Sequence, residues 1–249
     1  MDPVAFEIGA LQIRWYGIFI SSGIAIAIIL AYMECVRQKI DPDYIFTIAA
    51  FALPTAFIGA RLYYVIFRWN EYYKFHPEEI IAIWHGGLAI HGGVIGGVIA
   101  GYFVVKKYNL SFWKMADIVA PGIIIAQAIG RWGNFVNQEA YGYATDLPWA
   151  IYIDGAYRHP TFLYEFLWNI AVFALLIYRR YQPNTKQGEI FLGYVILYSA
   201  GRIFIESFRT DSLMVGEFRA AQLISLFLIT VGVGAYFYRK KKALLYNIK

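Results

Sequence analysis

The stretch GRWGNFVNQEAYG, residues 130–142, places several polar side chains directly after an apolar run. An ionisable side chain inside a membrane costs at least about 2.5–3.5 kcal/mol, so it usually faces a cavity or a partner. Arg131 ends the apolar run, Asn134 stands one helical turn beyond it, and Glu139 is near in sequence. The stretch indicates either an anion site or an interfacial turn in which Arg131 reaches the headgroups and the amides cap the helix.

A second polar cluster lies in YSAGRIFIESFRTD. Tyr198, Arg202 and Glu206 are spaced four residues apart, and Arg209 follows three residues later, so they share one helical stripe. The arginine precedes the glutamate, which is the less favourable order within one helix. The stripe indicates either a buried ion pair that fixes helix packing or an anion site in which a carboxylate holds a guanidinium fork.

Two arginines on separate segments, both near one side of a membrane, would suit a doubly anchored anion such as a phosphate. The abundant phosphate of a membrane is the phospholipid headgroup.

Three further side chains stand out in the sequence. His91 lies in the glycine-dense stretch HGGLAIHGGVIGGVIAG, where the glycines are typical of close helix packing. Its imidazole can serve as a general base near neutral pH, and a packed core histidine is the alternative. Tyr16, in RWYG, is most simply an interfacial aromatic residue. In RHPTFLYE, Glu165 places another carboxylate near a membrane interface.

The elements that must position these residues follow from composition. Of 249 residues, 59% are hydrophobic and 16% are charged, whereas average soluble domains hold roughly 25% charged residues. We therefore expect an all-α, polytopic integral membrane protein that forms one domain over 1–249. The net charge of +5 does not indicate nucleic-acid binding, because the basic residues cluster beside apolar segments.

A helix needs about 20 mostly apolar residues to cross a bilayer. The predicted spans, about seven, are 15–33, 44–66, 88–105, 116–131, 160–178, 188–206 and 220–238. The third is glycine-dense and could be broken or re-entrant. The N-terminus lacks the features of a cleaved signal peptide, so the first span is expected to be retained.

Lysine and arginine in the short loops predict the orientation, because cytoplasmic loops carry an excess of both. The segments predicted to be cytoplasmic are 34–43, 106–114, 179–187 and the tail with Arg239 to Lys242. The segments predicted to face outward are the N-terminus, 67–87, 132–159 and 207–219. Both arginine clusters then lie toward the outer side.

The chain contains no CxxC, HExxH, P-loop or GxSxG pattern and no aspartate-rich pair for a metal on pyrophosphate. The motifs of the common zinc, nucleotide and serine-nucleophile sites are therefore missing from this sequence. The single cysteine, Cys35, excludes an internal disulfide and lies in a predicted cytoplasmic loop, which makes it a poor nucleophile.

With these clusters assembled, the chain resembles the bacterial phosphatidylglycerol–prolipoprotein diacylglyceryl transferase family over nearly its whole length. GRWGNFVNQEAYG is similar to the family signature G-R-x-G-N-F-x-N-x-E-x-x-G at every fixed position. RWYG, HGG at 91–93, RHPTFLYE and the stripe on the sixth span support the resemblance. Phe162 departs from the glutamine common in the family, and TDS follows Arg209 where relatives often have EPD.

The resemblance implies transfer of a diacylglyceryl group from phosphatidylglycerol to the thiol of the lipobox cysteine in a prolipoprotein signal peptide, with release of glycerol phosphate. It implies a bacterial cytoplasmic (inner) membrane location, with the active site toward the periplasmic side. The nucleophile then belongs to the substrate, which agrees with a dispensable Cys35.

The resemblance also implies roles for the candidate residues. Arg131 and Arg202 would bind the phosphate, with Asn134 as a neutral donor, and Glu139 and Glu206 would position the arginines. His91 is the first choice for the base that deprotonates the thiol, and Glu206 is the alternative. The remaining residues of the predicted substrate-binding set are Tyr16, Gly142, Tyr198 and Arg209.

Two other classes of function compete. A lipid or anion transporter would line a permeation path with the same arginines, and an assembly protein would use Arg202 and Glu206 only to lock helices. A transporter predicts charges throughout the membrane depth, whereas these charges crowd toward the outer half.

Overall fold

The computed structural model describes residues 2–9 and 11–246. The chain divides into two compact units, one formed by Met1–Leu30 with Ala116–Lys249 and the other by Ala31–Met115. Each unit is described by itself. The side chain of Lys242, in the predicted basic tail, lies outside the description.

The described residues are mostly helical, and the helices match the predicted spans. Each helix begins within about one turn of a predicted start. The helices are α1 Trp15–Arg37, α2 Asp43–Phe67, α3 Ile90–Lys107, α4 Phe112–Val136, α5 Thr161–Arg180, α6 Glu189–Glu206 and α7 Ala220–Tyr246.

Five of the described helices, α1, α2, α4, α5 and α7, are long and apolar enough to cross a membrane. Only 17–44% of their most apolar windows is buried inside the protein, so much of the apolar surface faces outward. A lipid-facing surface of this kind is expected of a polytopic membrane protein. α3 and α6 have 18 residues each and are not among these five, because those 18 residues include polar and charged side chains.

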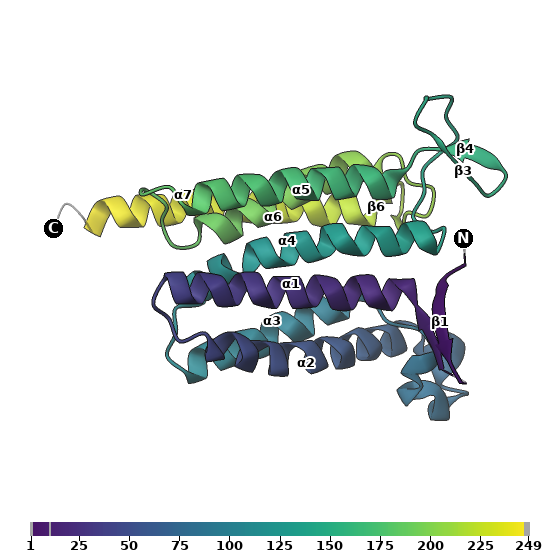
Figure 1. The fold of residues 1–249 in the computed structure, drawn as a ribbon, viewed down its shortest axis with the longest axis horizontal. Helices are drawn as coiled ribbons and strands as arrows, with labels where there is room; N and C mark the ends of the chain where they lie inside the picture. Colours follow the sequence, from purple (N-terminus) through teal and green to yellow (C-terminus); the bar gives the residue numbers. More distant parts are fainter. Residues whose placement is uncertain (1, 10, 247–249) are drawn as a thin grey trace. The chain divides into compact units, whose positions relative to one another are not determined.

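In the first unit, α4, α5 and α6 run alongside one another (Figure 1), and side chains from all three form one apolar cluster. The buried residues of this cluster are Ala120, Ile124, Val172, Leu176 and Ile190. The chain reverses between successive helices, so the C-terminal ends of α4 and α6 lie at the same end as the N-terminal ends of α5 and α7 (Figure 1). We call this end the hairpin end.

The opposite end of α4, α5 and α6 is tied by polar side chains. The carboxylate of Asp117, on α4, accepts hydrogen bonds from the backbone N–H of Gly188 at 2.5 Å and of Phe191 at 2.8 Å. It thereby caps the first turn of α6, whose N–H groups lack partners within the helix. Arg180, on α5, donates to the carbonyls of Asp117 and Ile118 at 2.8 and 3.0 Å. We call these residues the cap-end tie.

One short hairpin precedes α1 and two lie in connections between helices, and the all-α prediction missed them. They pair β1 Val4–Ile8 with β2 Leu11–Arg14, β3 Ile151–Ile153 with β4 Ala156–Arg158, and β5 Met214–Val215 with β6 Phe218–Arg219. The turn of the second hairpin is Asp154-Gly155, with φ of 52° and 74°. Positive φ at both central residues is the requirement of a type I′ turn, for which Asp-Gly is a favoured sequence.

The predicted end of the fourth span was also wrong. α4 continues to Val136, so Asn134 lies inside the helix rather than beyond it. The polar side chains at this end have partners that hydropathy does not reveal: Arg131 pairs with Glu165 on α5, and Asn134 bonds to Glu139 just beyond the helix.

In the second unit, α2 and α3 approach closely through glycines. A Cβ atom added to Gly59 would lie 2.4 Å from the carbonyl oxygen of Gly92, and one added to Gly96 would lie 2.5 Å from that of Thr55. The packing role expected of the glycines is confirmed, and α3 is one continuous helix rather than a broken one.

The connection between α2 and α3 holds three short helices, η1 Trp69–Tyr73, η2 Pro77–Ile81 and η3 Ile83–His85. The buried Arg61, on α2, fixes this segment by donating to the carbonyls of Ile80 at 2.8 Å and Gly86 at 2.6 Å. The segment is therefore an ordered structure and not a loose loop.

Candidate active site

Glu165 is the centre of a charged cluster at the hairpin end of the first unit. Its side chain, one turn into α5, is buried, with a relative exposure of 5%. Glu165 Oε2 lies 2.6 Å from Nε of Arg131 on α4, and Glu165 Oε1 accepts a hydrogen bond from Nη1 of Arg202 on α6. One carboxylate therefore holds two arginines from separate helices.

Two more charged residues extend the cluster along α6. Nη2 of Arg202 lies 2.7 Å from Oε2 of Glu206, which is 2% exposed. Arg209, just beyond the helix, has its Nη1 3.6 Å from Oε1 of Glu165. The predicted stripe of Arg202, Glu206 and Arg209 is thus assembled around a carboxylate from another helix.

Arg209 is fixed on its other side by Asp211. Its Nε and Nη2 donate to the two carboxylate oxygens at 2.9 and 2.8 Å, which is the bidentate geometry of a guanidinium fork. Burial raises the pKa of Asp211, but the hydrogen bonds and charge of Arg209 outweigh burial, so this pKa is lowered from 3.8. Conversely, burial lowers the pKa of Arg209, and Asp211, Glu165 and Glu206 outweigh it and raise that pKa.

A hydrogen-bonded chain leads outward from Arg131. Its Nη1 donates to Oδ1 of Asn134 at 3.1 Å, and Nδ2 of Asn134 donates to Oε1 of Glu139 at 2.8 Å. The exposed Glu139 also accepts from Nδ2 of Asn137 at 3.4 Å. Glu139 therefore contacts the arginine through Asn134, whose amide orientation it fixes, and not directly.

Gly142 lies where two chain segments cross beside the cluster. Its N–H donates to the carbonyl of His159 at 2.9 Å, and it forms an antiparallel bridge with Arg209. A Cβ atom at this position would lie 2.6 Å from Cβ of His159 and 2.8 Å from the carbonyl oxygen of Phe208. The absence of a side chain lets the strand that carries Arg209 approach.

The two candidate tyrosines lie at different places in the unit. The ring of Tyr16, on α1, lies against α4, because a Cβ on Gly133 would be 2.4 Å from Tyr16 Cδ2. Tyr198, on α6 one turn before Arg202, packs on the apolar cluster and stacks with Tyr194 at a centroid distance of 6.0 Å.

His91 belongs to the second unit. It is the second residue of α3, its side chain is exposed, and its ring centroid lies 5.9 Å from that of Tyr63. His91 therefore packs against α2, while the charged cluster belongs to the other unit.

Sequence reasoning noted Glu165 near an interface but did not assign it to the site. Its signal was the carboxylate in the first turns of an apolar helix. Among the described residues, no group of three or more His, Cys, Asp or Glu side chains is placed to hold a metal ion.

Fold and site together define a class: a polytopic helical membrane protein with a buried cluster of arginines and glutamates at one end of a helix bundle. Comparison with known proteins gives the particular family. The family model described as prolipoprotein diacylglyceryl transferase matches residues 3–238. This chain therefore belongs to the prolipoprotein diacylglyceryl transferase family, and it is a transferase.

Relatives from distant bacteria agree. Three proteins named phosphatidylglycerol–prolipoprotein diacylglyceryl transferase align with 97% of this chain. The protein of Listeria monocytogenes serotype 4a is 49% identical over 91% of its own length. That of Pediococcus pentosaceus is 46% identical over 91% of its length, and that of Trichormus variabilis is 45% identical over 92%.

Proposed function

We propose that this protein transfers the diacylglyceryl group of phosphatidylglycerol to the thiol of the lipobox cysteine in prolipoprotein signal peptides and releases glycerol phosphate. The names of its relatives describe this donor and acceptor. The observation that carries the proposal is the pair of arginines held by one buried carboxylate, Arg131 and Arg202 on Glu165.

The carboxylates hold these arginines without using all of their donors. Among the described residues, Nη2 of Arg131 and Nε of Arg202 make no hydrogen bond. A guanidinium fixed on one side and free on another is preorganised to bind a phosphate oxygen. Arg131 and Arg202 thus provide donors from two helices for one headgroup phosphate.

The arginines of the cluster can stabilise the negative charge of a leaving phosphate. Three guanidiniums, Arg131, Arg202 and Arg209, face the carboxylates of Glu165, Glu206 and Asp211. Formal charges therefore balance before the lipid binds. In the reaction the thiolate sulfur bonds to the glyceryl carbon, and the C–O bond breaks with its electron pair going to the phosphate oxygen. Fixed donors aimed at this developing charge are the main catalytic contribution.

The acceptor thiol must lose its proton. We assign the base to His91, whose imidazole can accept a proton near neutral pH. Glu206 is the alternative, but its carboxylate already lies 2.7 Å from the guanidinium of Arg202.

The remaining side chains shape the site. Glu139 orients Asn134, which presents its amide beside Arg131, while Tyr16 and Tyr198 orient headgroup oxygens. Gly142 admits the strand that brings Arg209 to the cluster. No metal or soluble cofactor takes part in this proposal.

The proposed setting is the bacterial cytoplasmic membrane, with the active site toward the periplasm. The chain forms one integral-membrane domain of seven spans, α1 to α7, with its N-terminus outside and its C-terminus in the cytoplasm. Arg179 and Arg180, at the end of α5 opposite to the charged cluster, support this orientation because basic residues mark the cytoplasmic side.

A transfer assay tests the proposal. Purified protein is mixed with phosphatidylglycerol and a lipobox peptide, and the peptide is examined for the mass of an added diacylglyceryl group. Arg131→Ala and Arg202→Ala should each lower the rate by roughly 10²–10³-fold or more. Arg179→Ala, at the other end of α5, is the matched control and should retain transfer.

The same purified protein also distinguishes a transferase from a transporter and from an assembly protein. A transporter would move lipid or anion across vesicles without any mass shift of the peptide, and an assembly protein would do neither. Near-normal transfer by Arg131→Ala would refute the phosphate role of this arginine.

A further inference from the structure

Two buried, uncharged polar side chains lie in the first unit just inside the charged cluster. Asn169 on α5 and Ser199 on α6 are each 1% exposed. Nδ2 of Asn169 and Oγ of Ser199 have no hydrogen-bond partner among the residues that the structure describes. Both groups are hydrogen-bond donors in a segment where the surrounding core is apolar.

Their depth follows from helix geometry. Asn169 is four residues after Glu165 on α5, and Ser199 is three residues before Arg202 on α6, so they lie about 6 and 4.5 Å further along their helices. α5 begins at the end where α6 finishes, so both steps lead in the same direction, away from the hairpin end (Figure 1). The ion pair between Glu165 and Arg202 sets a common level for the two helices.

A second contact between α5 and α6 agrees with this alignment of the two helices. Nε1 of Trp168 donates to the carbonyl of Leu197 at 2.9 Å, which joins α5 and α6 one turn inside the ion pair. Along the helix axes, Asn169 follows Trp168 directly and Ser199 lies two residues, about 3 Å, beyond Leu197. The two donors therefore form a neutral level, about one turn below the charged level.

Buried donors without partners are rare, because each such group loses its hydrogen bonds to water on burial. Asparagine and serine side chains inside a membrane protein commonly hydrogen-bond across helices, whereas Nδ2 of Asn169 and Oγ of Ser199 do not do so among the described residues. Packing alone would be served as well by Leu and Ala at these two positions. The placement of two donors beneath an anion site calls for a ligand that carries acceptors at that depth.

We propose that Asn169 and Ser199 donate hydrogen bonds to the ester carbonyl oxygens of the donor lipid. This inference rests on the proposed function, in which Arg131 and Arg202 bind the headgroup phosphate. Four bonds of about 1.5 Å separate the phosphate ester oxygen from the carbonyl carbon of the nearer acyl chain, an extended distance of about 5 Å. This distance matches the step from the charged level to the neutral level.

These hydrogen bonds predict a preference among donor lipids. An ester carbonyl only accepts hydrogen bonds, and the amide N–H and hydroxyl O–H groups donate them. An ether-linked lipid with the same headgroup and chain length lacks these carbonyl acceptors. The site should therefore prefer a diacyl donor over a dialkyl donor, although the bond that breaks in the reaction is the same in both.

The test compares diacyl and dialkyl phosphatidylglycerol of equal chain length as donors to the lipobox peptide. The wild-type kcat/KM for the diacyl lipid should exceed that for the dialkyl lipid by roughly twofold to tenfold for each hydrogen bond. Asn169→Leu and Ser199→Ala should each reduce this ratio toward one, mainly by slowing the diacyl reaction. Ser225→Ala, which changes a buried serine on α7, is the control and should keep the wild-type ratio.

Two results would overturn the inference. One is a wild-type enzyme that does not distinguish the two lipids. The other is a set of variants that lose activity toward both lipids equally, which is the behaviour of a packing defect. Ser199→Ala removes a single oxygen, so it keeps the comparison available if Asn169→Leu does not fold.

A binding measurement separates failure of this inference from failure of the proposed function. If wild-type protein transfers neither lipid, the proposed function fails. The rise in Tm that each lipid causes in the detergent-purified protein then tests the inference. Stronger stabilisation by the diacyl lipid, reduced in Ser199→Ala, supports ester recognition, and equal stabilisation refutes it.

Discussion

Replacing Glu165 by glutamine tests the cluster most directly. The change keeps the size of the side chain and removes the charge that Arg131 and Arg202 share. The glutamine can accept a hydrogen bond from one arginine, but its amide N–H₂ group then faces the other. We expect the second guanidinium to leave its position.

The size of the effect follows from burial. The side chain of Glu165 is 5% exposed and those of the two arginines are 18% exposed, so water compensates little for the lost charge. Breaking a buried ion pair costs about 3–5 kcal/mol, and the retained hydrogen bond favours the lower end. For a chain of this size, 3 kcal/mol corresponds to a fall in Tm of roughly 6–12 °C. If one phosphate donor is misplaced, transfer should fall by roughly 10²–10³-fold.

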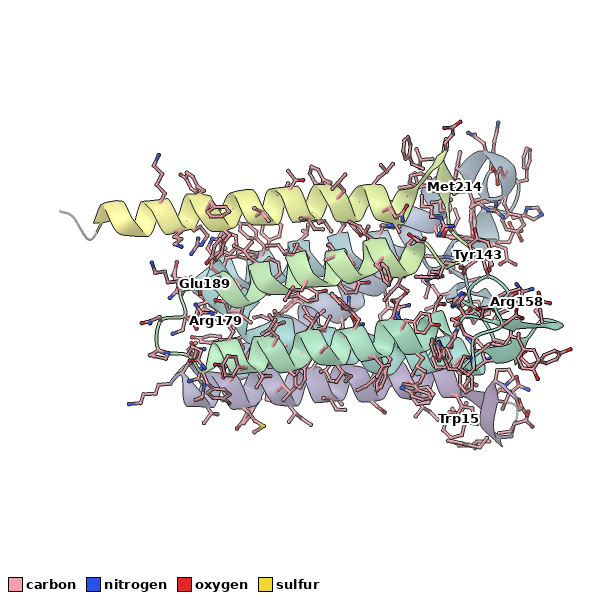
Figure 2. All side chains as sticks on the ribbon, turned by 90° about the horizontal axis from the view of Figure 1, so that it is seen from above. Trp15, Tyr143, Arg158, Arg179, Glu189 and Met214 are labelled. Atoms are coloured by element: carbon pink, nitrogen blue, oxygen red, sulfur yellow. The ribbon has the colours of Figure 1, made fainter. Side chains whose placement is uncertain are left out.

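The assay measures kcat/KM for diacylglyceryl transfer and thermal unfolding of the same purified protein. Glu189→Gln is the matched control, because Glu189 also pairs with an arginine, Arg179, at 2.9 Å. Figure 2 shows this pair at the end of the first unit opposite to Tyr143 and Arg158. Its partner is 42% exposed, so its loss should change Tm little and leave transfer intact.

Two results would contradict the reasoning. Glu165→Gln with wild-type transfer and wild-type Tm would show that the carboxylate does not hold the arginines. Equal losses in Glu165→Gln and Glu189→Gln would show that the effect is a general response to a broken ion pair.

Three further predictions concern the surroundings of the cluster. Gly142→Ala should lower both Tm and transfer, with a stability loss of about 1–3 kcal/mol, because its Cβ would press on two neighbouring segments; Gly234→Ala, with nothing within 4 Å, should do neither. Asp211 has a lowered pKa, so its bond to Arg209 stabilises the fold above the ordinary pKa and is lost as pH falls through the folded value. The difference in Tm between wild type and Asp211→Asn should therefore stay constant from pH 7 to about 4 and close at lower pH, and a constant difference at all pH values would exclude this linkage. His91→Gln should reduce transfer with partial rescue at high pH, whereas a loss that does not depend on pH would indicate a packing role.

The helices could be predicted from the sequence because hydropathy is a local property. The starts of α1 to α7 follow from apolar runs bounded by polar or charged segments. The end of α4 could not be predicted in this way, because hydropathy does not show that Arg131 pairs with Glu165 on another helix or that Asn134 bonds to Glu139 just beyond α4. Hydropathy marks where a helix can be buried in lipid and not where it stops.

The charged cluster was predictable in its arginines and less so in its carboxylates. Local spacing suggested that Glu206 would pair with Arg202, and these atoms do lie together. Glu165 is 34 residues after Arg131 and 37 before Arg202, so its central position depends on how α4, α5 and α6 pack. The hairpin turn at Asp154-Gly155 is a different case, because its Asp-Gly signal was visible in the sequence and was not used.

The cap-end tie bears on how a lipid could reach the arginines. α4, α5 and α6 are joined at one end by Glu165 and at the other by Asp117 and Arg180. Helices fastened at both ends cannot swing apart without breaking buried polar contacts at one of them. A two-tailed substrate moves sideways out of the bilayer, so we expect this trio to act as a fixed wall. The gate through which donor and lipidated product exchange would then be formed by helices outside the trio.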